Sequence, residues 1–300
     1  MNEKKYAVID IGSNSVRMRF QDSTEKYSVT TRLGLGLAQS GNLAPDRAKH
    51  SASVIMTFVR EASKRGLVPL AYATSAVRDA KNRDEFLELV RLICGIEVDI
   101  LSGEREAQYA YIGACGNKKC GLMDIGGASM QFVSENFKKS FPVGCVRGRD
   151  IALERTKDSP TDYPAQRAAL ESYLEELTAP YAEVLTLDRE AFVPCIGVGG
   201  TITTLCALSV DRFAISKAVG DGASLSRDTL EELIDFLLGL GNGRCGIGVL
   251  ASRHDVILYG AALLAKAMDM LSLDSITSSL RDGLDGYLDA AVRGEIGCVD

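Results

Sequence analysis

Metal-ligating side chains and long apolar runs are scarce in this chain of 300 residues. It has two histidines, and none of its eight cysteines forms a C-x-x-C pair, so the spacing typical of zinc sites is missing. We therefore expect reduced, mostly buried cytosolic thiols. The apolar stretch near the start is too short for a signal peptide, and the most apolar later segment, residues 256–271, is interrupted by Gly260, Lys266 and Asp269. These features predict a cytoplasmic protein without a membrane segment.

Positive charge is also in short supply. Lysine and arginine total 34 against 40 aspartates and glutamates, a net charge of -6. A protein body that binds nucleic acid normally shows a basic surface, so nucleic acid is not an expected partner. Any anionic ligand must instead be held by backbone N–H groups, a few arginines and a divalent metal. With 46% hydrophobic residues, the chain is long enough for two globular domains with buried cores.

Strand-like and helix-like segments alternate along the chain, which predicts an α/β fold. An opening meander is followed by a helix that starts at Pro45 and stops at Gly66, and Pro180 is expected to break a later helix. Strands are predicted at residues 6–10, 16–20, 26–33, 67–75, 96–102 and 191–198, and helices at 45–66, 85–94, 166–187, 228–240 and after Arg253.

An internal repeat divides the chain. The segment CGLMDIGGASMQFV, starting at Cys120, repeats the layout of AVIDIGSNSVRMRF, and the two D-I-G triplets begin at Asp10 and Asp124. An ancestral duplication explains this pattern. We predict two domains, residues 1–127 and 128–300, with the boundary near residue 127.

In both copies an apolar strand ends in aspartate, a glycine-containing turn follows, and a second strand leaves at once. Small residues there let backbone N–H groups approach an anion. One such turn would more often be an ordinary hairpin, but two matched copies favour a pair of turns that enclose a phosphate group from opposite sides. Asp10 and Asp124 are predicted to face the same space and to hold Mg2+ directly or through water. The predicted phosphate-binding residues are Gly12, Ser13, Asn14 and Ser15, and Gly126, Gly127, Ala128 and Ser129.

A third glycine-rich turn, in IGVGGTITTL at residues 196–205, ends a strand and opens an apolar helix. The N–H groups at a helix start can meet an anion with the helix dipole behind them. Gly199, Gly200 and Thr201 are therefore also predicted to bind phosphate. Tight packing of strand against helix is the alternative explanation.

The segment between the repeats, ILSGEREAQYAYIGA at residues 100–114, predicts a helix capped by Ser102. Glu104 and Glu106 fall in its first turn. Acidic residues are expected there on dipole grounds alone, so the segment taken by itself favours a surface position for Glu106.

Three arginines are candidate anion ligands: Arg32, Arg78 and Arg147. A solvated surface charge is the commonest alternative for each of them. Arg78 is preferred, because it follows a predicted strand and so lies at the edge of the sheet, where α/β sites gather.

Taken together, these motifs resemble the exopolyphosphatase and guanosine pentaphosphate phosphatase family, within the class of actin-like ATPase folds. The actin-like class shares only the phosphate hairpins, whereas ATSAVRDAKN and SGEREA are specific to this family. The resemblance implies two actin-like, ribonuclease H-like domains, with mixed sheets flanked by helices and a cleft between them. It is carried by AVIDIGSNSVRM, TRLGLGL, ATSAVRDAKNRDEF, ILSGEREAQYAYIGA, GLMDIGGASMQFV, FPVGCVR, CIGVGGTITTL and SLRDGL.

The family pattern also implies roles for individual residues. The acidic residue before Ala in the SGEREA-type segment is the family's general base, which is Glu106 here, in place of the surface position favoured above. Arg78 would act beside it by contacting the phosphates, and Asp10 and Asp124 would lie at the metal. Two departures stand out. Ala128 replaces the third glycine of DIGGGS, which a negative φ would tolerate, and Gln131 stands where the family usually has glutamate, a better Mg2+ ligand than an amide.

The implied activity is Mg2+-dependent release of the terminal phosphate from inorganic polyphosphate, pppGpp or both, with water activated by glutamate. Two alternatives stay open. One is a kinase of the same fold that passes phosphate from ATP to a small acceptor. The other is a non-catalytic sensor of polyphosphate or guanosine polyphosphates, which the two departures keep open. A homodimer is a reasonable expectation for such an enzyme.

Overall fold

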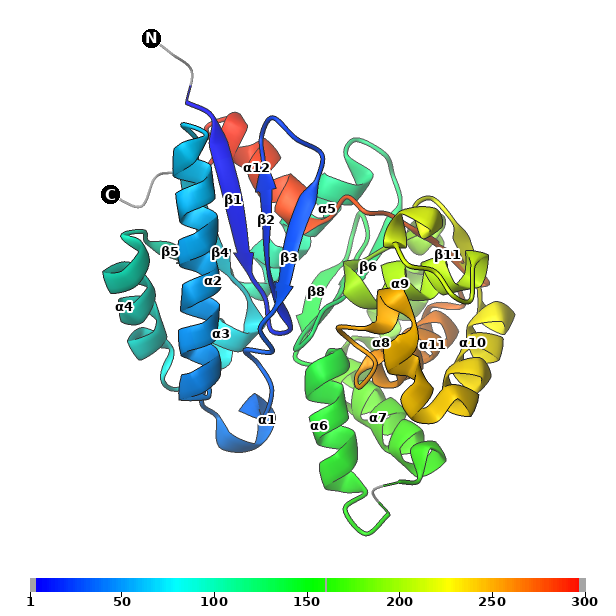
Figure 1. Cartoon of the computed structure of the whole chain (residues 1–300). Coiled ribbons are helices and arrows are strands. Elements are labelled where there is room, and N and C mark those ends of the chain that lie inside the picture. The colour runs from blue at the N-terminus through cyan, green and yellow to red at the C-terminus, as the bar shows by residue number, and fades with distance from the viewer. Residues whose placement is uncertain (1–3, 160, 297–300) are drawn as a thin grey trace.

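The chain folds into two mixed β-sheets with helices on their faces (Figure 1). This computed structural model describes residues 4–159 and 161–296. In the first sheet, the antiparallel meander is extended by parallel strands on its other side. In spatial order its strands are β3 (Lys26–Thr30), β2 (Ser15–Phe20), β1 (Tyr6–Ile11), β4 (Val68–Ala73) and β5 (Val98–Ile100).

The second sheet repeats this layout and adds one strand at its edge. An antiparallel meander is again followed by parallel strands, as expected for a duplicated unit. Its strands are β8 (Lys138–Phe141), β7 (Met130–Val133), β6 (Gly121–Ile125), β9 (Cys195–Val198), β11 (Ser275–Ser278) and β10 (Ser224–Ser226). The predicted fold class, mixed sheets flanked by helices, is confirmed.

Helices cover both sheets, and short 3-10 turns such as η3 (Lys217–Gly220) join some of them. The helices of the first half are α1 (Leu37–Ser40), α2 (Pro45–Lys64), α3 (Ser75–Asp79), α4 (Arg83–Cys94) and α5 (Gly103–Cys115). Those that follow are α6 (Cys145–Arg155), α7 (Tyr163–Thr178), α8 (Ala182–Leu187), α9 (Gly199–Val210), α10 (Arg227–Leu240), α11 (Ile257–Leu271) and α12 (Gly283–Val292).

Helix α5 lies between the two sheets. Its residues Ala107 and Ala110 belong to one apolar cluster with Leu122 and Val198 of the second sheet. On its other side it packs along α12, which covers the first sheet through Leu284, Tyr287 and Leu288 (Figure 1). A side chain on α5 is therefore positioned by both halves of the molecule.

The path of the chain differs from the predicted domains 1–127 and 128–300 at two places. Strand β6 belongs to the second sheet although it precedes residue 127, and α12 packs on the first sheet although it is near the end of the chain. The repeat locates the two hairpins, but it carries no information about where the last helix returns.

Most predicted elements are present, although some of their bounds differ. The strand predicted at 191–198 begins only at Cys195, because Pro194 has no amide hydrogen for the sheet and residues 189–192 form a 3-10 turn. The break at Pro180 is confirmed, since η1 (Ala179–Tyr181) separates α7 from α8. Helices α6 and α12 were not expected from the sequence.

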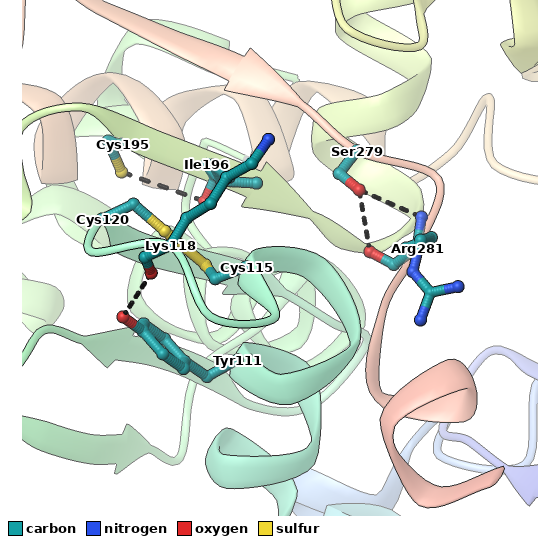
Figure 2. The surroundings of a disulfide bond; sticks show 8 residues. All are labelled: Tyr111, Cys115, Lys118, Cys120, Cys195, Ile196, Ser279 and Arg281. Carbon is teal, nitrogen blue, oxygen red and sulfur yellow. Dashed lines mark hydrogen bonds between the residues drawn. A yellow bond between two sulfur atoms is a disulfide. The ribbon is translucent and has the colours of Figure 1, made fainter. Parts of the chain in front are cut away.

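A disulfide closes the loop between α5 and β6 (Figure 2). It joins Cys115, the last residue of α5, to Cys120, and their Cα atoms lie 6.8 Å apart. The expectation of reduced thiols is wrong for this pair, because the short turn after the helix brings two cysteines together without a C-x-x-C spacing. Cys94, Cys145, Cys195, Cys206 and Cys245 are free thiols, and Cys298 lies outside the described residues.

No helix in the described ranges is both long and apolar enough to cross a bilayer.

The close crossing of α5 and α12 requires glycine on both helices. A methyl group on Gly286 would lie 2.9 Å from the amide nitrogen of Gly113 and closer still to the Tyr109 carbonyl. We therefore expect Gly286→Ala to lower the free energy of unfolding by roughly 1–3 kcal/mol, as overpacking does, in a urea titration. Gly239→Ala is the control: an added Cβ there meets no atom within 4 Å, so this variant should be slightly more stable than the parent. Equal stability of the parent and Gly286→Ala would contradict the close approach of α5 and α12 at this glycine.

Candidate active site

A cavity of about 1120 Å³ lies between the two sheets, and nearly all the predicted site residues line it. Arg78 and Ala128 do not belong to its lining. The predicted residues that line it are Asp10, Gly12, Ser13, Asn14, Ser15, Glu106, Asp124, Gly126, Gly127, Ser129, Gly199, Gly200 and Thr201.

The two glycine-bearing turns have the same geometry. The Gly12 amide donates to the Ser15 carbonyl at 3.1 Å, and the Gly126 amide donates to the Ser129 carbonyl at 3.0 Å. The turns also touch, because a methyl group on Gly127 would lie 2.8 Å from the Ser13 Cβ. The duplicated hairpins thus form one continuous wall of the cavity, as the repeat predicts.

Strand alternation places Asp10 and Asp124 on equivalent faces. On β1, Ile9 and Ile11 pack with α2 in the first core, so Asp10 points to the opposite face, which α5 and α12 cover. On β6, Met123 and Ile125 point into the second core, so Asp124 likewise faces α5. The two carboxylates therefore meet at the cavity.

The third turn closes the cavity at the start of α9. Gly199 has a φ of +84°, which a residue with a side chain rarely adopts, and it lies directly against Asp124. Gly200 lies under the guanidinium of Arg253. The turn is therefore closely packed, as its alternative explanation requires, and its residues also line the cavity.

Glu106 reaches the cavity from the first turn of α5. The Ser102 hydroxyl accepts a hydrogen bond from the Arg105 amide at 3.2 Å, which confirms Ser102 as the N-cap. The Glu106 carboxylate accepts hydrogen bonds from Arg78 Nη1 at 3.1 Å and from the Ser129 hydroxyl at 3.2 Å. Burial raises the pKa of Glu106 above its ordinary value, and the charge of Arg78 offsets part of this.

The candidate arginines all lie in ion pairs. Arg78 lies behind Glu106 and donates a second hydrogen bond to the Leu101 carbonyl at 2.8 Å. Arg32 pairs with Asp255 at 3.2 Å, and Arg147 pairs with Asp79 at 2.6 Å. Direct contact between Arg78 and phosphate stays a prediction, whereas its contact with Glu106 is a feature of the structure.

Both departures from the family pattern have a structural explanation. Ala128 is buried, and its φ is not in the left-handed region, so its methyl group is accommodated. Gln131 is buried away from the cavity lining, and its amide donates to the Ser129 and Ser140 hydroxyls, each at 3.0 Å. Gln131 therefore holds Ser129, which in turn donates to Glu106.

The cavity lining holds six basic side chains that the sequence did not single out, among them Arg17, Arg253 and Lys217. Arg17 lies opposite Asp10 in the β-ladder, the position that Gln131 occupies opposite Asp124, so an alignment of the two repeats would have pointed to it. Its Nε donates to Asp10 Oδ2 at 2.8 Å. Arg253 and Lys217 lie in irregular segments without a periodic signal.

Arg253 and Lys217 lack carboxylate partners within the described part of the chain. Arg253 is buried, and its Nε has no hydrogen-bond partner there. Burial lowers the pKa of Lys217 well below its ordinary value, and the positive charges of Arg253 and Arg17 lower it further. Cations that repel one another around a cavity attract an anion.

The carboxylates fit a divalent cation. Asp10 Oδ1 is buried and finds no hydrogen-bond partner among the described residues. Burial first, and then the carboxylates of Asp282 and Glu106, raise the pKa of Asp124 to about 7. Residues 4–159 and 161–296 contain no cluster of three or more His, Cys, Asp or Glu side chains suited to a metal ion. Mg2+, however, is often held by one or two carboxylates together with substrate phosphates and water.

The chain is similar to known proteins over most of its length. The chain is 30% identical to exopolyphosphatase 1 of Mycobacterium bovis, with 93% of this chain and 87% of that protein covered. It is 27% identical to a guanosine-5'-triphosphate,3'-diphosphate pyrophosphatase of Vibrio atlanticus, covering 93% of this chain and 58% of that enzyme. The crystal structure of an exopolyphosphatase from Cytophaga hutchinsonii superposes with a TM-score of 0.83 at 22% identity, over 97% of this chain and 98% of the other, so the fold is the same.

The family model describing Ppx/GppA phosphatases matches residues 8–289, which include both hairpins, α5 and α9. The resemblance seen in the sequence motifs is thereby confirmed. The chain belongs to the Ppx/GppA phosphatase family.

Proposed function

We propose that this protein hydrolyses the terminal phosphoanhydride bond of inorganic polyphosphate, pppGpp or both. The observation that carries the proposal is the position of Glu106: its carboxylate lines the cavity beside both hairpins and accepts a hydrogen bond from Ser129 of the second one. The names of the M. bovis and V. atlanticus relatives support the same class of substrate.

In the proposed reaction, the two hairpins and the start of α9 hold the terminal phosphoryl group. Glu106 orients a water molecule for in-line attack on its phosphorus and takes the proton. The bridging P–O bond breaks, and its electron pair goes to the oxygen of the departing chain. Mg2+ held by Asp10 and Asp124 would offset negative charge on the phosphate oxygens.

The unpaired cations would hold the rest of the substrate. Arg253 and Lys217 line the same cavity beyond the start of α9, where an extended polyanion would continue from the hairpins. Burial, and after it the charges of Arg253 and Arg17, lower the pKa of Lys217, and phosphates of the substrate would offset both effects.

Release of phosphate from polyphosphate, pppGpp and ATP, measured side by side with and without Mg2+, tests the proposal against its alternatives. A hydrolase releases phosphate without an added acceptor. A kinase would turn over ATP only when an acceptor is present, and a sensor would bind polyphosphate without turnover at millimolar Mg2+. Either of these two outcomes would overturn the proposal.

Glu106→Gln should lower the rate of phosphate release by about 10²- to 10⁴-fold, because the amide cannot take the proton from water. Thermal unfolding should show that the variant stays folded. Glu104→Gln is the matched control, since Glu104 lies in the same helical turn but is exposed, and it should keep the parental rate. Equal rates for Glu106→Gln and the parent would remove Glu106 from the reaction.

Asp124→Asn tests the metal site without turnover. A buried carboxylate with a pKa of about 7 destabilises the metal-free fold above that pH, and this destabilisation fades as the pH falls from 7 toward 4. In chelator at pH 8, the free energy of unfolding of the variant should therefore exceed that of the parent by up to about 4 kcal/mol, and the gap should close near pH 4. Added Mg2+ should raise the unfolding temperature of the parent more than that of the variant. Asp84→Asn, at an exposed carboxylate, serves as the control. Mg2+ stabilisation that is the same in the parent and Asp124→Asn would exclude Asp124 as a ligand.

Lys217→Ala should weaken binding of polyphosphate roughly tenfold, because a charge-assisted hydrogen bond is lost. Calorimetry at fixed ionic strength measures this, with Lys217→Arg expected to retain most of the affinity. Lys64→Ala, at an exposed lysine on α2, controls for the change in net charge. Parental affinity in Lys217→Ala would place the polyanion elsewhere.

A further inference from the structure

Asp79 connects the two halves of the molecule to the Arg78–Glu106 pair. It is the last residue of α3, and each of its carboxylate oxygens meets a different arginine. Oδ2 accepts a hydrogen bond from Arg147 Nη2 at 2.6 Å, and Oδ1 lies 3.4 Å from Arg78 Nε. Arg78 in turn donates to Glu106 at 3.1 Å. Four charged groups thus form an unbroken chain that ends on Glu106.

These charged groups are fixed to different halves of the molecule: Arg147 to the second half, and Asp79 and Arg78 to the first. The backbone amide of Arg147 donates to the Gly127 carbonyl at 3.0 Å, so Arg147 is anchored to the second hairpin. Helix α3 lies beside the first hairpin, where the hydroxyls of Ser75 and Ser13 are 3.4 Å apart. Arg147 therefore reaches Asp79 only when the second hairpin approaches the first.

We infer that Asp79 is a positioning residue that makes the orientation of Arg78, and through it that of Glu106, depend on the approach of the two halves. Arg147 fixes the Asp79 carboxylate, whose ion pair with Arg78 Nε at 3.4 Å then favours the orientation in which Nη1 binds Glu106 and the Leu101 carbonyl. Without Arg147, Asp79 loses its partner from the second half and holds Arg78 less firmly. This inference rests on the proposed function, in which Glu106 activates water.

Another ion pair across the same boundary offers a control. Asp255 pairs with Arg32 of the first half at 3.2 Å and with Arg149 of the second at 3.5 Å, and neither partner contacts Arg78 or Glu106 in the described structure. Loss of Asp255 thus weakens the contact between the halves but leaves the Arg78–Glu106 pair in place.

Steady-state phosphate release from polyphosphate should separate the two sites. Asp79→Asn keeps the shape of the side chain and removes its charge, and we expect kcat to fall about tenfold with little change in KM, since misplacement of a catalytic group acts on the chemical step. Asp255→Asn should keep kcat within about twofold of the parent. Parental kcat in Asp79→Asn, or an equal loss in both variants, would overturn the inference.

Exchanging the charges of Asp79 and Arg147 tests whether Asp79 only joins the two halves or also positions Arg78. The double variant Asp79→Arg with Arg147→Asp restores an attractive pair between the halves but places a guanidinium beside Arg78. We expect its kcat to stay low. Recovery of the parental kcat would show that Asp79 only joins the halves, which contradicts the inference.

A measurement without turnover separates this inference from the proposed function. In protein labelled with nitrogen-15 arginine, the Arg78 Nε–H signal, assigned by its absence in Arg78→Lys, should be protected from solvent exchange. That protection should be lost in Asp79→Asn and kept in Asp255→Asn. If the parent releases no phosphate, the proposed function fails, and the exchange data still decide whether Asp79 holds Arg78. Unchanged protection of the Arg78 Nε–H in Asp79→Asn would show that Asp79 does not position Arg78.

Discussion

The site depends on a carboxylate that is held from two sides. Glu106 accepts one hydrogen bond from Arg78 of the first half and another from Ser129 of the second. Helix α5, which carries it, is itself packed between the two sheets and against α12. The position of Glu106 that the proposed reaction requires therefore exists only when both halves of the duplicated fold are in contact.

The charges around the cavity are arranged for ligands rather than for stability. Burial raises the pKa values of Asp10, Glu106 and Asp124, and it lowers those of Arg253 and Lys217. For each of these groups, burial disfavours the charged form. A divalent cation between the carboxylates and a polyanion against the basic groups would relieve both conflicts, which is the expected pattern at a functional site.

The sequence predicted the parts of the site that repeat or follow a periodic pattern. The two hairpins and the aspartates at the strand ends were visible because the motif occurs twice, and the start of α9 because glycines precede an apolar helix. Glu106 was identified only through the family resemblance, since its own segment suggested a surface helix. Arg253, Lys217 and the return of α12 could not be predicted, because they depend on which distant segments pack together. The contact of Gln131 with Ser140 depends on the register of β7 and β8, which no local pattern fixes.

The central claim is that water held at Glu106 attacks the terminal phosphorus of a phosphoanhydride. Turnover of polyphosphate in water labelled with heavy oxygen tests it directly, with the released orthophosphate and the shortened chain analysed by mass spectrometry. The account predicts label in the released orthophosphate and none at the new chain end, because the bridging oxygen leaves with the chain. Label at the chain end, or phosphate passed unlabelled to another acceptor, would contradict it.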